Sequence, residues 1–463
     1  MDTEERERLA QDLDQAVARL EAERARHQAG LEPSPSLVPC FGGRRADEWL
    51  DAARRVKDAG DAALATRLLR LRIELAGAPH EEAWRAAEGA ARIDGPAGPL
   101  ALSDAERALA REGDRPRRRA LAQAISTAME GPARHREAWA EALARTAASV
   151  GCYPDWEVVV EGDQLLGACD DAWRDLLGFM ARRDLGLVVA PAGEVGALER
   201  HDLLRLTAFP ALDGLFRPMA LARAVHALAR DLGLARTLDD GRVRVDESPR
   251  AQALPLAHPE GARTTFRAAG GLPDWPSLLD ALGRSLVAAH QPPHRRDPIF
   301  AATLGRLLAG LCLEPRWLAA QLGVEKKDAP DLVRALALRE LLRIRAGAAA
   351  LRVATEVERG LSGRAWREAH REALSAACLA AWDGVRASRD AQAAPLAATV
   401  RGFAEGERLR AALRDRFDED WWRNPRTREH LAGLLAAGRL HGDEPASAVA
   451  AAAGLARVVE RGG

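Results

Sequence analysis

The chain has 463 residues, which allows about two or three ordinary domains, or one large domain with a substantial core. Its 67 basic and 68 acidic residues are spread along its length, and this balance argues against binding to nucleic acid or to an acidic membrane surface. The five scattered cysteines form no C-x-x-C pair, so a disulfide framework and a cysteine metal site are disfavoured and a reducing compartment is indicated.

Residues 1–33 are expected to form a charged helix followed by a linker. Leu9, Leu13, Val17 and Leu20 have the spacing of one helix face. The opposite face is so charged that the helix either lies on the surface or pairs with another helix. The charged start has no apolar signal segment, and no run reaches the ~18 apolar residues that cross a bilayer, so a soluble cytoplasmic protein is expected.

Residues 34–235 are expected to form an N-terminal helical lobe. Helical spacing predicts helices at about 45–77, 80–92, 102–128 and 132–149, with breaks at the G-D-R-P and G-P-A-R segments. The β-branched runs W-E-V-V-V-E-G (Trp156–Gly162) and L-G-L-V-V-A-P (Leu185–Pro191) are compatible with strands or with helix ends. Strand signals are therefore few in this lobe.

Residues 236–463 are expected to form a second lobe. Within Thr237–Arg267, a D-G turn precedes the alternating Val243 and Val245, and two more extended runs are separated by proline-containing turns, which predicts a small antiparallel sheet. Helical spacing then returns, with a helix at 274–290 and further helices to residue 463. The predicted fold class is mainly α with one small sheet.

Motifs that carry familiar chemistry are absent from the sequence. It contains no G-x-x-x-x-G-K-[ST], no G-x-G-x-x-G after a strand and no G-x-S-x-G. None of the eleven histidines belongs to an H-E-x-x-H motif; His80 begins H-E-E-A-W, with Trp84 in the place of the second histidine. No catalytic residue is assigned from motifs.

The order of segments after the predicted sheet resembles the helical gluzincin metallopeptidases, the group of oligoendopeptidase F, thimet oligopeptidase and angiotensin-converting enzyme. The resemblance spans roughly residues 200–440 and lies in order and spacing more than in single letters. The matching residues are Gly270, Gly271, Asp274, Trp275, Gly283 and His290 in G-G-L-P-D-W-P-S-L-L-D-A-L-G-R-S-L-V-A-A-H, and Asp297, Pro298, Pro315, Trp317 and Leu318 in the next segment. It implies a large bilobed helical fold, with the small sheet beside the helix that binds zinc in such enzymes.

The resemblance places the chemical positions of those enzymes on unsuitable residues here. The two zinc-binding histidines correspond to Asp280 and Arg284, the general-base glutamate to Ala281, and the third ligand to a position near Ala302. A tyrosine that helps to stabilise the oxyanion has its nearest equivalent at Thr399. A catalytic zinc needs three donors and an open position, so we expect no metal and no other cofactor. Asp280 and Arg284 are four residues apart and predict an ion pair on one helix face.

The leading expectation is a catalytically inactive peptidase-like protein that binds a peptide or protein partner in its cleft. An extended peptide would lie beside the edge of the small sheet, where a strand edge offers hydrogen bonds without zinc. The candidate cleft residues are His258, His290, Thr399 and Arg401. One alternative is an active hydrolase with a relocated site, built from His258, His290 and His294 with Glu260 and Asp297 nearby. The other is a purely structural scaffold whose cleft has closed.

Overall fold

The structure is a computed structural model that describes most of the chain. The described residues are 2–29, 46–95, 98–151, 157–190, 197–248, 252–255, 261–266, 271–292, 296–325, 327–390, 392–440 and 446–461. His258, Glu260, His294 and the predicted linker at 31–39 lie outside these ranges.

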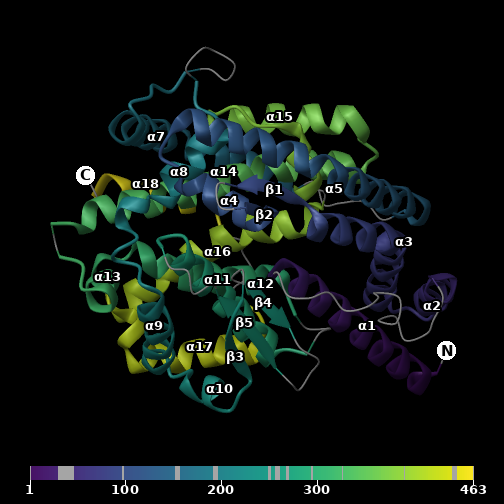
Figure 1. Ribbon diagram of the computed structural model, residues 1–463. Coiled ribbons are helices and arrows are strands. Elements are labelled where there is room, and N and C mark those ends of the chain that lie inside the picture. Colours follow the sequence, from purple (N-terminus) through teal and green to yellow (C-terminus); the bar gives the residue numbers. More distant parts are fainter. Residues whose placement is uncertain are drawn as a thin grey trace.

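Helices dominate the described residues, which confirms the mainly α fold class (Figure 1). The helices before the main sheet are α1 (Thr3–Ala29), α2 (Ala46–Asp58), α3 (Ala62–Ala90), α4 (Leu102–Arg111), α5 (Arg115–Val150), α6 (Glu157–Ala168), α7 (Asp170–Leu185), α8 (Arg200–Ala208), α9 (Pro218–Asp231) and α10 (Ala235–Asp239). Those after it are α11 (Asp274–His290), α12 (Pro298–Ala309), α13 (Pro315–Leu322), α14 (Ala329–Glu358), α15 (Gly363–Cys378), α16 (Ala393–Phe417), α17 (Pro425–Ala437) and α18 (Ala448–Arg461).

Two predicted helix breaks are wrong. The predicted break between residues 77 and 80 falls inside α3, which continues through Pro79, and the G-P-A-R break falls inside α5, which continues through Pro132. A proline inside a helix removes one backbone hydrogen bond, but α3 and α5 pack along each other, and Met129 and Ala133 beside Pro132 are buried in a core with α4. This packing outweighs the local penalty. The break at G-D-R-P is confirmed, because Asp114 caps the start of α5.

The ambiguous β-branched runs do not form strands. Residues 157–162 lie in α6, and residues 186–190 have no regular structure. A hairpin that the sequence reading missed, β1 (Arg92–Gly95) and β2 (Gly98–Ala101), lies between α3 and α4.

The main sheet lies where it was predicted, but it is mixed and not antiparallel throughout. Its strands are β3 (Val243–Glu247), β4 (Gln252–Pro255) and β5 (Ala262–Phe266), in the order β3-β5-β4. β4 pairs with β5 antiparallel, whereas β3 pairs with β5 parallel. The chain reverses direction between β3 and β4 and again before β5, so β3 and β5 run the same way. Because β5 takes the central place, its pairing with β3 must be parallel.

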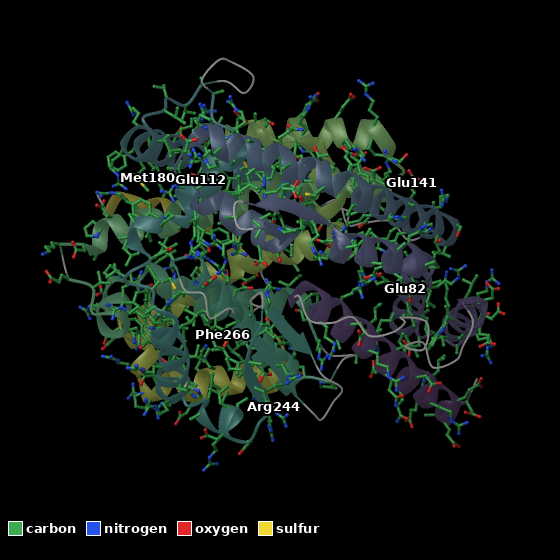
Figure 2. The ribbon with its side chains drawn as sticks, viewed as in Figure 1. Glu82, Glu112, Glu141, Met180, Arg244 and Phe266 are labelled. Carbon is green, nitrogen blue, oxygen red and sulfur yellow. The ribbon has the colours of Figure 1, made fainter. Side chains whose placement is uncertain are left out.

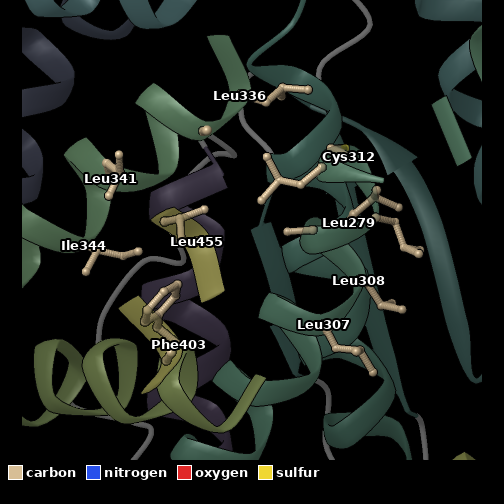
Figure 3. Close-up of a cluster of buried hydrophobic side chains, with 14 of the residues drawn as sticks. Leu279, Leu307, Leu308, Cys312, Leu336, Leu341, Ile344, Phe403 and Leu455 are labelled. Carbon is tan, nitrogen blue, oxygen red and sulfur yellow. The ribbon is translucent and has the colours of Figure 1, made fainter. Parts of the chain in front are cut away.

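The largest hydrophobic core takes side chains from α6 to α18, between residues 158 and 455. Figure 3 shows part of it, with Leu279 of α11, Leu307 of α12, Leu341 of α14 and Phe403 of α16. α11, α12 and α16 pack in succession through this core, and α14 packs on α16. The division of the chain at 33 and 235 stays a prediction, since this core includes residues from both sides of 235.

The first three helices share a smaller core of their own. Leu9, Leu13 and Leu20 of α1 are buried with Trp49 of α2 and Leu68 of α3, so the predicted apolar stripe faces other helices. Charged side chains such as Glu82 of α3 and Glu141 of α5 cover the outer faces (Figure 2). Among the described residues, no helix is both long and apolar enough to cross a membrane.

Candidate functional site

The site lies where the backbones of α11 and α12 are in direct contact. A Cβ added to Gly283 would lie 2.4 Å from the carbonyl oxygen of Leu304 and 2.5 Å from the backbone nitrogen of Gly305. Real Cβ atoms do not come so close, so the two backbones meet directly at this glycine. Gly283, which the sequence analysis matched to a glycine of gluzincin zinc helices, therefore has a packing role here, and the helices around residues 280 and 302 lie together.

Asp280 and Arg284 form the predicted ion pair on α11. The Arg284 Nε donates to the Asp280 Oδ2 at 2.7 Å, and the two side chains keep 29% and 26% of their surface exposed. The other carboxylate oxygen of Asp280 is buried and has no hydrogen-bond partner among the described residues. Partly exposed pairs of this kind contribute only about 0.3–0.5 kcal/mol. The Asp280–Arg284 pair therefore adds little to the stability of the fold.

Ala302 does not face this pair across an open space. It is 2% exposed, and a Cβ added to Gly402 of α16 would lie 2.4 Å from the Ala302 Cβ. α12 is thus enclosed between α11 and α16 at this level. The position where the resemblance predicts a third zinc ligand is closed by a neighbouring backbone.

A cavity of about 540 Å³ opens beside the ion pair. It is lined by Asp280, Ala281 and Arg284 of α11, Ala398 and Thr399 of α16, and residues of α1, α3 and α12. A second cavity of about 460 Å³ shares part of its wall and extends between α3, α5, α14 and α16. The residues that line both are Glu74, Pro298, Gln392, Ala394 and Ala398. We call the two cavities together the cleft.

The charged groups of the cleft are mostly neutralised in pairs. Arg24 of α1 donates to Glu74 at 2.6 Å and to Glu81 at 2.8 and 2.9 Å. Burial works against the charge of Glu81, but the Arg24 guanidinium outweighs it and lowers the pKa of the Glu81 carboxyl. Arg401 binds Glu161 through two hydrogen bonds of 2.9 and 3.0 Å. The positive charges of Arg24 and Arg401 are therefore both neutralised by carboxylates.

Glu358 is the exception among the acids of the cleft. It accepts a hydrogen bond of 2.7 Å from the backbone N–H of Ala393, the first residue of α16. Burial raises the pKa of its carboxyl, the nearby Glu74 adds to the rise, and Arg70 offsets only part of it. Around Glu358, the second cavity is lined mainly by aliphatic side chains such as Leu143 and Leu351.

Of the residues that the sequence placed in the cleft, two line it and His290 does not. Thr399 lines the first cavity and Arg401 the second. His290 lines neither, and its Nδ1 lies 2.8 Å from the carbonyl oxygen of Leu286. Asp297 caps α12 by accepting from the Ile299 N–H at 2.8 Å. His258, His294 and Glu260 lie outside the described residues.

Sequence reasoning missed Arg24, Glu74 and Gln392, which line the first cavity. They come from α1, α3 and the residue before α16, far from α11 in sequence. Charged residues on amphipathic helices usually face solvent, so no local pattern marks Arg24 or Glu74 as cleft residues. Only the packing of α1 on α3 brings them to α11.

The residues that the resemblance places at a metal position do not fit a zinc ion. Asp280 supplies one carboxylate, but its neighbour in the site is the fixed positive charge of Arg284, and Ala281 and Ala302 have no donor atom. Ala302 could not be exchanged for a ligand side chain without moving α16. Within the described ranges, no group of three or more His, Cys, Asp or Glu side chains is placed to hold a metal.

Below the site, α12 continues into a buried network of charges. Arg306, which is 1% exposed, pairs with Glu340 of α14 at 2.5 Å and with Glu407 of α16 at 2.7 Å. Glu407 also pairs with Arg410, and Arg410 with Glu314 at 3.1 Å. The network ties α12, α14 and α16 together behind the cleft, so it fixes the wall that carries Ala302.

Comparison with known proteins identifies solved structures with a similar fold. No family model and no curated protein matches the sequence. Among solved structures, PZ peptidase A with an inhibitor superposes with a TM-score of 0.57 at 11% identity, covering 96% of this chain and 86% of that one. A protein assigned as an oligoendopeptidase F from Bacillus anthracis str. Ames gives 0.54 at 11% identity, covering 96% and 84%.

A third similar structure is the carboxypeptidase of Pyrococcus furiosus, with a TM-score of 0.52 at 10% identity over 100% of this chain and 99% of that one. Identities this low speak for the fold alone. Over nearly its whole length, the chain therefore has the gluzincin-like helical fold shared by oligoendopeptidase F and related peptidases.

Proposed function

We propose that this chain is a catalytically inactive peptidase-like protein that binds a peptide or protein segment in its cleft. The observation that carries the proposal is the combination of an open cleft with an ion pair, Asp280–Arg284, at the position where the related fold holds its metal. The groups that bind zinc and activate water in such enzymes are replaced by residues that supply neither function.

The dimensions of the cleft support binding. Its two cavities, of about 540 and 460 Å³, each fall in the usual range of roughly 300–1,000 Å³ for ligand sites. A purely structural scaffold with a closed cleft would have no such space beside Asp280 and Arg284. Aliphatic side chains in the second cavity and paired charges in the first suit a peptide, which presents apolar side chains and a polar backbone.

Hydrolysis is not supported by the groups that line the cleft. Ala281 provides no general base, and Arg284 occupies the second ligand position with a hydrogen bond to Asp280. The alternative, a hydrolase with a relocated site, would need His290, which is directed to the carbonyl of Leu286 on its own helix. We therefore expect binding without cleavage.

The test combines binding and cleavage in one peptide library. A fluorescein-labelled random decapeptide library is offered to the wild type, to Ala394→Trp and to Ala412→Trp. Ala394 is exposed and lines both cavities, whereas Ala412 is an exposed residue of the same helix that lines neither. We expect retention of peptides by the wild type and Ala412→Trp, at least a tenfold loss with Ala394→Trp, and intact peptides by mass spectrometry.

Three results would contradict the proposal. Equal retention by the two tryptophan variants would remove the cleft as the binding site. Cleavage that a chelator abolishes, or stoichiometric zinc by elemental analysis of the purified protein, would show that an active metal site exists after all.

A further inference from the structure

Glu358 differs from the other acids of the cleft because no cation is paired with it among the described residues. It is the last residue of α14 and lines the second cavity. Its Oε1 accepts the hydrogen bond from the Ala393 N–H at 2.7 Å, whereas its Oε2 accepts none from the described part of the chain. Glu74, which lines the same cavity, is bound by Arg24 at 2.6 Å. One oxygen of Glu358 is therefore left for another donor.

Arg70 of α3 is the cation that acts on Glu358 from a distance. It lines the same cavity, but its side chain is exposed and no ion pair joins it to Glu358. Removing a carboxylate from water costs free energy unless a cation or several hydrogen bonds replace the water. Glu358 has one such hydrogen bond, and its position in the cavity suits a group that receives its cation from a ligand.

The walls around Glu358 are aliphatic. They are formed by Ile73, Leu143, Val158, Ile299 and Leu351, from five different helices. A lysine side chain combines an apolar stem of four carbons with a charged head, so its stem can pack on such walls while its ammonium group reaches a carboxylate. The second cavity, of about 460 Å³, offers both surfaces to one side chain.

The hydrogen bonding of Glu358 also favours lysine over arginine. A guanidinium binds a carboxylate best through two parallel hydrogen bonds, one to each oxygen. Here Oε1 is already engaged by the Ala393 N–H, so that arrangement is partly blocked. An ammonium group is a compact charge that needs one oxygen, and Oε2 can supply it.

We propose that the second cavity is a lysine-binding subsite, in which the stem of a ligand lysine lies on the aliphatic walls and its ammonium group is bound by Glu358. The subsite rests on the peptide binding proposed above and names the class of peptide that the cleft selects. A peptide with a glutamate in place of that lysine is repelled by Glu358.

The subsite is tested with Glu358→Gln, which removes the charge but keeps an oxygen for the Ala393 N–H. Glu356→Gln is the matched control, because Glu356 lies on the same helix, lines neither cavity and has a 45% exposed side chain. The ligands are N-acetylated, fluorescein-labelled decapeptide libraries without charged residues, except that one central position is lysine, arginine, norleucine or glutamate. Norleucine has the apolar stem of lysine without its charge.

We expect the wild type and Glu356→Gln to bind the lysine library about tenfold more tightly than the norleucine library, with arginine between the two and glutamate weakest. In Glu358→Gln the lysine and norleucine libraries should bind equally. The urea midpoint of Glu358→Gln should equal or exceed that of the wild type, because no cation of the fold loses an ion-paired partner within the described residues. A much lower midpoint would contradict the subsite, because it would assign the carboxylate a role in stability.

A small ligand separates the subsite from the binding of peptides. Pentylammonium and 1-pentanol are compared by ligand-observed NMR, and we expect contact of pentylammonium with the wild type and Glu356→Gln but not with Glu358→Gln. This result together with no retained peptide would support the subsite and contradict the proposed function. Retention of the lysine and norleucine libraries to the same degree by the wild type would overturn the subsite and leave peptide binding standing. Equally tight binding of a norleucine library with a free N-terminus would also overturn it, because Glu358 would then bind the terminal amine.

Discussion

Ala302 of α12 lies directly against Gly402 of α16, so that a Cβ on Gly402 would come within 2.4 Å of the Ala302 Cβ. The contact limits which side chains fit at 302, the position where the resemblance to gluzincin peptidases predicts a third zinc ligand. A residue larger than alanine at 302, or larger than glycine at 402, would force α12 and α16 apart. The packing of these two helices therefore favours a small residue at 302 and excludes a glutamate there without rearrangement.

Installing a zinc ligand at this position should therefore fail. In a variant with Asp280→His, Ala281→Glu, Arg284→His and Ala302→Glu, we expect no stoichiometric zinc and a loss of stability dominated by Ala302→Glu. Overpacking costs about 1–3 kcal/mol, and an unpaired buried carboxylate adds to that cost. Elemental analysis and urea unfolding measure the two effects.

Ala301→Glu is the control for that experiment, because Ala301 lies on the same helix but is only half-buried. It should cost clearly less than Ala302→Glu. Tight zinc binding by the fourfold variant at wild-type stability would contradict this prediction, because it would show that α16 can move away from residue 302 at little cost.

Gly283→Ala should destabilise the protein by about 1–3 kcal/mol, because the added Cβ would collide with the backbone of α12. Gly347 of α14 is the matched control, since it is also inside a helix but has nothing within 4 Å of an added Cβ. Gly347→Ala should stabilise by roughly 0.5–1 kcal/mol through helix propensity. Opposite shifts in the urea midpoint are the expected result, and two shifts of the same sign would contradict the close contact.

The sequence was sufficient for features that depend on neighbouring residues. The spacing of Asp280 and Arg284 predicted their ion pair, and the D-G turn before Val243 located the sheet. It was not sufficient for features set by distant packing. The order β3-β5-β4 depends on which strand takes the centre, and the place of Arg24 in the cleft depends on α1 lying across α3. The helix break predicted at Pro132 was wrong because the burial of α5 outweighed the loss of one backbone hydrogen bond at the proline.

Replacing Arg284, which lines the cleft, and replacing Arg306, which is buried behind it, should have very different effects on the free energy of unfolding. Arg284→Gln should change the free energy of unfolding by no more than about 0.5 kcal/mol, because its pair with Asp280 keeps over a quarter of each side chain exposed. Arg306→Gln should cost about 3–5 kcal/mol, because Glu340 and Glu407 would remain buried without their shared cation. Chemical denaturation of both variants makes the comparison, and equal costs would mean that the buried network relaxes freely.

The buried network also predicts how stability depends on pH. Burial alone would raise the pKa of Glu340, but Arg306, Arg343 and Arg339 outweigh it and lower the pKa to about 2, from an ordinary value of 4.5. A carboxyl whose folded-state pKa is lowered stabilises the fold fully above its unfolded pKa. That contribution is lost as the pH falls from about 4.5 towards 2. We therefore expect the urea midpoint to fall through this window.

Glu340→Gln isolates the contribution of this carboxyl. The variant should be less stable at pH 7, because Arg306 and Arg343 lose a charged partner, and its stability should decline less steeply between pH 4.5 and 3. Glu368→Gln is the control, since the Glu368 side chain is 45% exposed and its partner is the exposed Arg364 of the same helix, α15. A pH profile of Glu340→Gln parallel to that of the wild type would show that other carboxyls drive the acid transition, and that the charges joining α12 to α14 do not.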